Sequence, residues 1–431
     1  MNKKADINVV TMGCSKNLVD SERLMRQLVA VGYTVAHDAE TDSAPVVIIN
    51  TCGFIGDAKE ESINTILLFV EAKKQQLIKQ LYVFGCLSQR YKNMLEQEIP
   101  EVDAYFGVHD MEAVLQTMNA SLQPHLLNER QLSTPAHYAY LKISEGCNWG
   151  CAYCAIPLIR GKHISVPIEQ LVDETEKLAA QGVKELLVVA QDTTYYGMDC
   201  YGRRRLADLL NALSAVEGIE WIRLHYTYPT AFPDDVIALL RDNPKLCKYI
   251  DIPLQHVADE VLTKMRRGIN GQQTRELIAR LRSEAPGIAI RTTLIVGHPG
   301  EDEAAFQELK EFVRAVRFER LGVFCYSEEE GTYSADNYED EISEEIKQAR
   351  RDELMALQAS IVATESAAKI GTVCKVIIDR KEGGYYAART EHDSPEVDNE
   401  VLIKAEQLVI GNFYQVRITN AYIYDVYAEI I

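Results

Sequence analysis

Cys147-Asn148-Trp149-Gly150-Cys151-Ala152-Tyr153-Cys154 places three thiols within eight residues, directly after the strand-like run Tyr138 to Ile143. Thiolates hold iron-sulfur clusters, which usually take four of them. Three cysteines at this spacing can bind three corners of a four-iron cluster and leave the fourth iron open. An open metal position is typical of a catalytic site, whereas structural metal sites are closed. The stretch therefore predicts a catalytic cluster on Cys147, Cys151 and Cys154, whose open iron can receive the amino and carboxylate groups of S-adenosylmethionine.

A structural zinc site is the main alternative for this stretch. Such a site needs four ligands, and the nearest candidates for a fourth, His163 and Cys200, do not form a second close pair. A disulfide with one spare thiol is the other alternative. The chain shows no signal-peptide run at its start and no apolar run long enough to span a bilayer. We therefore expect a cytoplasmic protein without membrane contact, whose ten cysteines are ligands, catalytic groups or small core residues.

The length of the chain indicates how many domains it forms, and its net charge indicates which partners it attracts. The chain has 431 residues, of which 47% are hydrophobic and 25% charged, as in ordinary globular proteins with two or three domains. Its formal net charge is −19. A polyanion such as RNA would be repelled over most of this surface, whereas a basic protein would be attracted.

Three apolar runs near the start of the chain each lead into a cysteine. Helical patterns follow the first two runs, and strands that alternate with helices predict βαβ units with a parallel sheet. Ligands of such sheets bind at the carboxyl ends of the strands, so we expect the three thiols at one edge, where they hold a second cluster with an open iron. The alternative is that each is a small buried residue, as free cysteine often is. The runs and their cysteines are Ile7 to Met12 with Cys14, Val46 to Ile49 with Cys52, and Leu81 to Phe84 with Cys86.

A polar stretch from Asn128 to Pro135 is the predicted linker to a second region. Six apolar runs separated by helical patterns follow it. They fit a partial barrel of six βα units, built like the eightfold barrel whose chemistry lies at the carboxyl ends of the strands. The runs are Tyr138 to Ile143, Glu185 to Ala190, Ile219 to His225, Tyr249 to Pro253, Ala289 to Val296 and Arg320 to Phe324.

Polar residues beside these runs are candidate cofactor contacts. Gln191 and Gln255 lie just beyond predicted strands and can hydrogen-bond the amino-acid part of S-adenosylmethionine. Arg291 can meet its carboxylate in a charge-assisted pair. The alternative for each is a solvated loop residue. Gly297-His298-Pro299-Gly300 is expected to form a turn.

The last part of the chain predicts a small β-barrel. An acidic stretch, Glu328 to Glu345, is expected to be a solvated connection into a long helix from Ile346 to Ala368. Five short strands with turns then suit a small open barrel of the oligonucleotide-binding kind. From Ser366 onward there are seven Lys and Arg against ten Asp and Glu, so the basic stripe typical of RNA binding is missing. The expected strands are Thr372 to Ile378, Tyr385 to Arg389, Glu400 to Ile403, Phe413 to Ile418 and Tyr422 to Tyr427; Cys200, Cys247, Cys325 and Cys374 show no partner spacing and are expected to be ordinary small residues.

Together these pieces resemble the methylthiotransferases of the radical S-adenosylmethionine class over the whole chain. Glu145 through Cys154, with Tyr153 before the last cysteine and Arg160-Gly161 after the loop, resembles the catalytic loop of that family. Gly13 through Glu22, Asn50-Thr51-Cys52 and Gly85-Cys86 resemble its N-terminal cluster domain, and the last region resembles its C-terminal TRAM domain. We therefore expect a multidomain α/β protein with an N-terminal parallel α/β cluster domain at residues 1–127, a partial TIM-like radical S-adenosylmethionine barrel at 134–365, and a five-stranded TRAM barrel at 367–431.

Two substrates compete within this family, a modified adenosine of tRNA and an aspartate side chain of a ribosomal protein. Gln191 through Gly197, Asp251 through His256 and Asp393 through Asp398 are similar to the branch that modifies the small-subunit ribosomal protein uS12. One departure is Asn399, because that branch more often has glycine at this position. The difference affects only the expectation of a local turn there. The acidic terminal barrel agrees with a basic protein substrate better than with tRNA, whose binding we do not expect.

The resemblance also implies cofactors and a mechanism. It implies two 4Fe-4S clusters, one on Cys147, Cys151 and Cys154 and one on Cys14, Cys52 and Cys86, and S-adenosylmethionine in contact with Tyr153. Acid–base chemistry cannot replace hydrogen on an aspartate β-carbon, so a 5′-deoxyadenosyl radical is expected to abstract it. The second cluster supplies sulfur, a second S-adenosylmethionine supplies the methyl group, and 3-methylthioaspartate is the product. An electron donor and a monomeric state are expected, with the terminal barrel docking the substrate.

Overall fold

The computed structural model describes residues 5–431, which fold as two compact units. The first unit runs up to Thr134 and adds residues 140–149 and 154–177. The second unit consists of residues 135–139, 150–153 and 178–431. The cysteine stretch is therefore divided, because Cys147 and Cys154 belong to the first unit and Cys151 belongs to the second.

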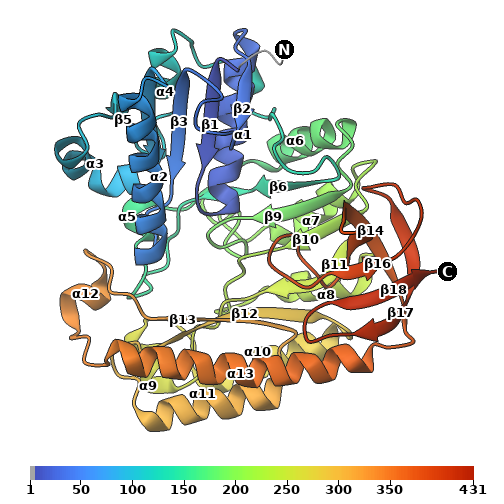
Figure 1. Cartoon of the computed structure of the whole chain (residues 1–431). Helices are drawn as coiled ribbons and strands as arrows, with labels where there is room; N and C mark the ends of the chain where they lie inside the picture. Colours follow the sequence, from blue (N-terminus) through green and yellow to red (C-terminus); the bar gives the residue numbers. More distant parts are fainter. Residues whose placement is uncertain (1–4) are drawn as a thin grey trace. The chain divides into compact units, whose positions relative to one another are not determined.

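The first unit contains the expected parallel sheet, with strands in the order β2-β1-β3-β4-β5 (Figure 1). The three strands expected from the sequence are present as β1, β3 and β4, and the short strands β2 and β5 extend the sheet at its two edges. The strands are β1 Ile7–Thr11, β2 Val35–His37, β3 Val46–Thr51, β4 Gln80–Gly85 and β5 Ala104–Tyr105, and the helices are α1 Ser15–Ala30, α2 Gly56–Lys74, α3 Cys86–Glu98 and α4 Met111–Thr117, followed by a 3-10 helix at Pro124–Leu126.

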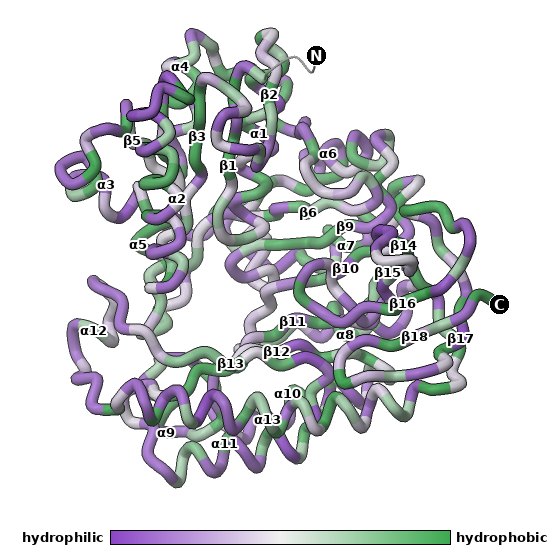
Figure 2. Tube along the Cα trace, in the orientation of Figure 1, coloured by the Kyte–Doolittle hydropathy of each residue, from purple (hydrophilic) through white to green (hydrophobic). Residues whose placement is uncertain are grey.

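Helices cover both faces of this sheet because its strands are apolar on both sides. Val47 and Ile49 of β3 pack in one core with residues of α2 and α3, whereas Ile48 packs in another core with residues of α1 and α4. Figure 2 shows β1 and β3 as hydrophobic over most of their length. A sheet that is buried on both faces presents functional side chains at the ends of its strands.

The segments around the cysteine stretch complete the first unit. Strands β7 and β8 pair antiparallel on either side of the loop that carries the cysteines. The predicted linker from Asn128 to Pro135 makes contacts of its own, since Arg130 is only 3% exposed. Its guanidinium lies 3.3 Å from Glu22 and 3.2 Å from Glu174, so two buried carboxylates hold this segment. The elements are β6 Tyr138–Lys142, which starts in the second unit, β7 Ser144–Glu145, α5 Ile156–Arg160, β8 Ile164–Ser165 and α6 Ile168–Ala180.

A parallel sheet with strands in chain order forms the larger part of the second unit. Its order is β13-β12-β11-β10-β9-β6, which confirms the expected series of six βα units. Local signals fix the start of two of its helices: Asn270 and Gln273 form a capping box at α10, and the Asp302 carboxylate accepts from the Ala305 N–H at α11. The elements are β9 Glu185–Val189, α7 Leu206–Ser214, β10 Trp221–Leu224, α8 Asp234–Asp242, β11 Leu246–Asp251, α9 Asp259–Lys264, α10 Gly271–Glu284, β12 Ala289–Val296, α11 Glu303–Val316 and β13 Arg320–Cys325.

The acidic stretch after β13 is more structured than expected. Helix α12 (Tyr333–Asn337) begins inside it, and Glu329 and Ser334 are buried. The long helix α13 (Glu344–Ala368) runs along α11 in Figure 1. Its buried Lys347 lies 2.6 Å from both Asp340 and Glu344. The prediction of a solvated connection is therefore wrong at Glu329 and Ser334, whereas most of the acidic residues in the stretch are exposed as expected.

The last part of the chain forms a closed barrel, whereas the sequence predicted an open one. Parallel pairing of β16 with β18 closes the strand order β14-β15-β16-β18-β17. The predicted strand at Tyr422 to Tyr427 is shifted toward the C-terminus, because the Tyr422 N–H bonds the Asp425 carbonyl in a turn. The strands are β14 Val373–Glu382, β15 Tyr385–Thr390, β16 Val401–Ile403, β17 Phe413–Ala421 and β18 Val426–Ile430.

Buried charges join this barrel to the sheet of the second unit. Arg389 of β15 donates to Glu185 of β9 at 2.7 Å and to Asp379 of β14 at 2.6 Å. Arg223 of β10 donates to the other oxygen of Glu185 at 2.8 Å. Because Glu185 and both arginines are almost fully buried, each charge depends on its partners, and the network fixes how the barrel sits on the sheet. None of the helices in the described part of the chain has the length and apolar character needed to span a bilayer.

Candidate functional site

The structure brings Cys14, Cys52 and Cys86 together at the carboxyl edge of the first sheet. Cys14 directly precedes α1, and Cys86 is the first residue of α3. A Cβ placed on Gly13 would lie 2.9 Å from the Cys52 Sγ, and one on Gly53 would lie 2.9 Å from the backbone of Cys86. Gly13 also has φ +88°, in the left-handed region that favours glycine. The loops of Cys14, Cys52 and Cys86 therefore pack so closely that a side chain larger than glycine does not fit at Gly13 or Gly53.

Asn17 connects these loops, although the sequence analysis gave it no role of its own. Its Nδ2 donates to the Met12 carbonyl at 2.9 Å and to the Thr51 carbonyl at 3.1 Å, which lie just before Cys14 and Cys52. Its Oδ1 lies 3.7 Å from the Cys86 Sγ. The side-chain amide of Asn17 thus contacts all three cysteine loops and holds them together. This role explains an asparagine three residues after Cys14.

The three thiols differ in their electrostatic surroundings. Burial raises the pKa of Cys52, and it raises the pKa of Cys86 to about 12. Burial acts in the same direction on Cys14, but Lys16, Arg160 and nearby backbone N–H groups outweigh it and lower the pKa of that thiol. Cys14 is therefore the most easily deprotonated of the three, and a bound metal would deprotonate the other two.

The donor set of this edge fits an iron-sulfur cluster. Among the described residues, no three His, Cys, Asp or Glu side chains are placed to hold a single metal ion. A four-iron cluster has a different requirement, because each thiolate binds its own iron and the sulfurs stand further apart. Three soft thiols at one edge are the type of ligand that an iron-sulfur cluster takes.

Cys147, Cys151 and Cys154 lie in the loop between β7 and α5, and all three are half-buried. The ends of the loop meet, since the Cys147 N–H donates to the Gly161 carbonyl at 3.1 Å. The two candidates for a fourth zinc ligand have other surroundings. The ring of His163 lies 3.0 Å from the Ser165 Oγ, and Cys200 is exposed.

Arg267 is the cation nearest to the middle of this loop in the second unit. Its Nη1 lies 3.4 Å from the Cys151 Sγ and 3.3 Å from the Tyr153 hydroxyl. Tyr228 completes the contact, with its hydroxyl 3.3 Å from the same sulfur and its ring 4.2 Å from the guanidinium carbon. Arg267 is buried, so its charge is felt strongly by a thiolate at Cys151. Sequence reasoning missed it, because nothing in the chain near residue 267 signals the contact.

Gln255 presents a buried acceptor, as a cofactor contact would. Its Oε1 is buried and has no hydrogen-bond partner among residues 5–431. Its backbone has φ +72° and donates to the Thr293 carbonyl at 2.9 Å, so the fold holds the residue in a strained conformation. Gln191, the second predicted contact, lies two residues after the end of β9 and is half-buried. An unsatisfied buried acceptor costs stability unless a ligand satisfies it.

Arg291, the third predicted contact, has protein partners in this structure. Its Nη1 donates to Asp398 at 3.0 Å, and its Nε lies 3.7 Å from Asp251. Asp398 is 1% exposed at its side chain and also accepts from the Tyr249 hydroxyl at 2.8 Å. The pairing competes with the predicted role of Arg291 as a partner for the carboxylate of a cofactor.

His298 lies in a buried aromatic group beside Tyr153. The two ring centroids are 6.3 Å apart, and the imidazole Nε2 lies 3.0 Å from the Ser334 Oγ. Burial lowers the pKa of His298 to about 4, so the ring is neutral at physiological pH. The expected turn at Gly297 to Gly300 thus also contributes to the surroundings of Tyr153.

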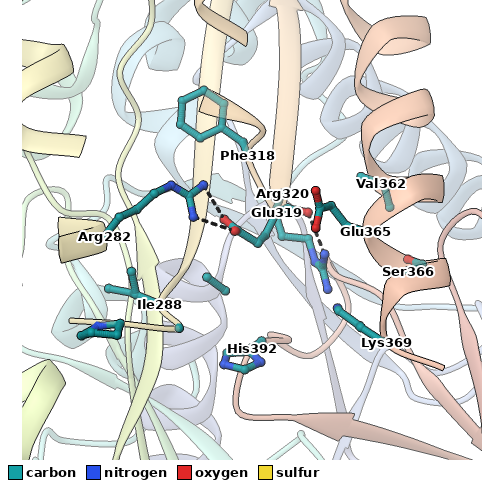
Figure 3. Close-up of a pocket in the computed structure, with 13 residues that line it drawn as sticks. Arg282, Ile288, Phe318, Glu319, Arg320, Val362, Glu365, Ser366, Lys369 and His392 are labelled. Carbon is teal, nitrogen blue, oxygen red and sulfur yellow. Dashed lines mark hydrogen bonds and ion pairs between the residues drawn. The ribbon is translucent and has the colours of Figure 1, made fainter. Parts of the chain in front are cut away.

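A cavity of about 360 Å³ lies elsewhere in the second unit, at the segments that lead into β12 and β13 (Figure 3). Figure 3 shows Arg282 directed at Glu319, and the two side chains are 2.9 Å apart. Chemistry in parallel α/β sheets occurs at the opposite, carboxyl ends of the strands. We therefore do not place the active site in this cavity.

Comparison with known protein families gives three matches along the chain. A model described as the radical SAM superfamily matches residues 141–313, and one described as uncharacterized protein family UPF0004 matches residues 6–107. A TRAM domain model matches residues 370–431. The matches confirm the resemblance of all three regions.

Similar proteins of full length are known. The ribosomal protein uS12 methylthiotransferase RimO of Phocaeicola vulgatus is 55% identical over 431 residues, covering all of both chains. The RimO of Porphyromonas gingivalis is 54% identical over 428 residues, which is 99% of each chain. Among solved structures, the radical S-adenosylmethionine methyltransferase TsrM of Kitasatospora setae aligns with a TM-score of 0.55 at 14% identity, covering 88% of this chain and 79% of that one. This last likeness shows the fold alone.

Proposed function

Because the chain belongs to the family of ribosomal protein uS12 methylthiotransferases named RimO, we propose that it attaches a methylthio group to the β-carbon of an aspartate in uS12. The observation that carries this proposal is the presence of two sets of three cysteines, one in a short loop and one gathered at the edge of a separate sheet. A methylthiotransferase needs one site for radical generation and one for sulfur.

We propose that each set holds one 4Fe-4S cluster. When bound, the clusters and S-adenosylmethionine supply radical generation, sulfur and the methyl group. Cys147, Cys151 and Cys154 hold the first cluster, and Cys14, Cys52 and Cys86 hold the second. In each set three thiolates leave one coordination position for a ligand that the protein does not provide.

The surrounding side chains orient these groups and exclude water. Arg267 and Tyr228 hold Cys151 from one side. Gln255 offers its free carbonyl oxygen to the amino group of S-adenosylmethionine, and Gln191 and Tyr153 are proposed as further contacts. Arg291 reaches the cofactor carboxylate only if it gives up Asp398, so we rank it last among the proposed contacts.

Charge favours a basic protein as the substrate. The formal net charge of −19 attracts a basic ribosomal protein and repels tRNA. We propose that the terminal barrel docks the substrate. Its turn between β17 and β18 exposes Tyr422 and Tyr424 beside Asp425, a combination that can stack on and pair with Arg or Lys side chains. An electron donor, a monomeric state and a cytoplasmic location belong to the same proposal.

The direct experiment offers both family substrates to anaerobically reconstituted protein. We expect a methylthio mass increment on uS12 and none on tRNA, together with about eight irons per chain, as two four-iron clusters require. Cys14→Ala and Cys147→Ala should each retain about four irons. Cys200→Ala, which alters an exposed cysteine outside both sets, is the matched control. A methylthio increment on tRNA alone would overturn the proposed substrate, and a colourless protein that binds only zinc would overturn the proposed chemistry.

A further inference from the structure

Arg160 is a buried cation of the first unit to which the proposed chemistry gives no role. It is 3% exposed and ends α5, six residues after Cys154. We infer that Arg160 is a positioning residue that supplies a fixed positive charge to the N-terminal cysteine site and raises the reduction potential of the cluster held there. The inference rests on the proposed function, because it needs a cluster on Cys14, Cys52 and Cys86.

The contacts of Arg160 lead directly to these cysteines. Its Nη2 donates to the Asn17 Oδ1 at 2.5 Å, and that oxygen lies 3.7 Å from the Cys86 Sγ. The Asn17 Nδ2 donates to the Met12 and Thr51 carbonyls, so the residue that binds Arg160 also contacts the loops of the other two cysteines. Arg160 therefore acts on the whole site and not on a single ligand.

Carboxylates hold the opposite side of the guanidinium. Its Nη1 lies 3.2 Å from Asp20 and 2.9 Å from Glu145. Lys142 pairs with both of these carboxylates, so the four side chains are neutral as a group. Because the carboxylates contact Nη1 and the Asn17 amide contacts Nη2, the positive side of the group faces the cysteines.

The same four residues fasten the chain segments that carry both sets of cysteines. Asp20 lies in α1, six residues after Cys14, and Glu145 lies two residues before Cys147. These contacts all lie within the first unit. Since each of the four side chains is partly or fully buried, the positive charge is held in place in a region of low dielectric.

A fixed charge in such a region has a defined effect on a cluster. Net charge and nearby hydrogen bonds set the reduction potential of iron-sulfur clusters. A cluster with three thiolate ligands becomes more negative when it accepts an electron, so a nearby guanidinium stabilises the reduced state. Removing the guanidinium should make reduction harder, and removing one of the carboxylates behind it should make reduction easier.

The test isolates the N-terminal cluster in a variant that combines Cys147→Ala, Cys151→Ala and Cys154→Ala. In this background, potentiometric electron paramagnetic resonance gives the midpoint potential, and chemical analysis gives the iron content. We expect Arg160→Gln to lower the midpoint by about 59 mV or more, a tenfold change in the one-electron equilibrium constant. Arg160→Lys should restore at least half of the shift, and Asp20→Asn should move the midpoint in the opposite direction.

Arg130→Gln is the matched control. It removes another almost fully buried arginine of the first unit, one that pairs with Glu22 and Glu174. An unchanged midpoint in Arg160→Gln and in Asp20→Asn, with about four irons retained, would overturn the inference and leave the proposed function standing. If the background variant with Arg160 intact holds no cluster, the proposed function itself fails. If Arg160→Gln alone does not fold, the opposite shift in Asp20→Asn still decides the question.

Discussion

The guanidinium of Arg267 lies 3.4 Å from the sulfur of Cys151, and both belong to the second unit. A buried cation at this distance stabilises a thiolate and also fixes its direction. The middle of the cysteine loop is therefore held by a residue that lies 116 positions later in the chain.

Replacing Arg267 should therefore affect the loop cluster selectively. We expect Arg267→Gln to retain about four of the eight irons proposed and to lose reductive cleavage of S-adenosylmethionine at least tenfold. Iron analysis and 5′-deoxyadenosine formation with dithionite measure the two effects. Arg266→Gln, a change at the exposed neighbour, should leave both values unchanged. A full iron content with normal cleavage in Arg267→Gln would show that the contact is structural only.

Gln255 should matter for the cofactor and not for stability. Its Oε1 has no hydrogen-bond partner in the described structure, so Gln255→Met removes an acceptor that costs stability while no ligand satisfies it. We expect an unchanged or slightly higher melting temperature, and binding of S-adenosylmethionine weakened about tenfold, the effect of roughly 1.4 kcal/mol. Calorimetry on the reconstituted protein measures both. A large loss of stability without a loss of affinity would contradict this role.

The network around Arg389 should be essential for the barrel. Arg389→Met leaves Asp379 and one oxygen of Glu185 buried without their main partner, which costs about 3–5 kcal/mol of unfolding free energy. Arg380→Met, which removes a half-exposed partner of Glu400, should cost much less. Urea unfolding measures the difference. Equal losses in the two variants would show that burial does not decide the strength of these pairs.

His298 should make stability fall as the solution becomes acidic. Its pKa is about 4 in the folded protein, below the ordinary value of about 6.5, because burial disfavours the protonated ring. The unfolded chain then binds more protons between these two pH values, so stability is fully present above about 6.5 and is lost as the pH falls toward 4. Replacing the ring by His298→Asn should flatten this part of the pH profile. A wild-type profile parallel to that of the variant would contradict the assignment.

Exposed aromatic residues on the barrel provide a test of substrate docking. We expect the double variant Tyr422→Ala with Tyr424→Ala to raise the KM for uS12 several-fold and to leave 5′-deoxyadenosine formation without substrate unchanged. Added salt should raise the wild-type KM, because it screens attraction between exposed charges. Tyr333→Ala, at an exposed tyrosine outside the barrel, is the control. A KM that responds to neither the double variant nor salt would exclude the barrel as the docking surface.

The sequence predicted the placement of residues correctly where a pattern of strand followed by cysteine is repeated. Cys14, Cys52 and Cys86 are far apart in the chain, yet each follows a strand, and a parallel sheet places such positions at one edge. It failed where a side chain meets a distant partner. Arg160 and Asn17 lie inside motifs of the family resemblance and Arg267 lies outside them, but none of the three could be given its contacts, because their partners are tens or hundreds of residues away. Sequence alone also did not show that Asp398 of the barrel segment reaches Arg291, whose contact with a cofactor stays a prediction.

The path of the backbone limits how this protein can be dissected. The chain leaves the first unit after Thr134, returns at Tyr140, departs again for residues 150–153, and leaves finally after Lys177. No single cut yields two intact halves, and a truncated chain that stops at any one of these crossings lacks part of one half. A domain swap between relatives keeps each unit from one parent only if residues 135–139, 150–153 and 178–431 are exchanged together.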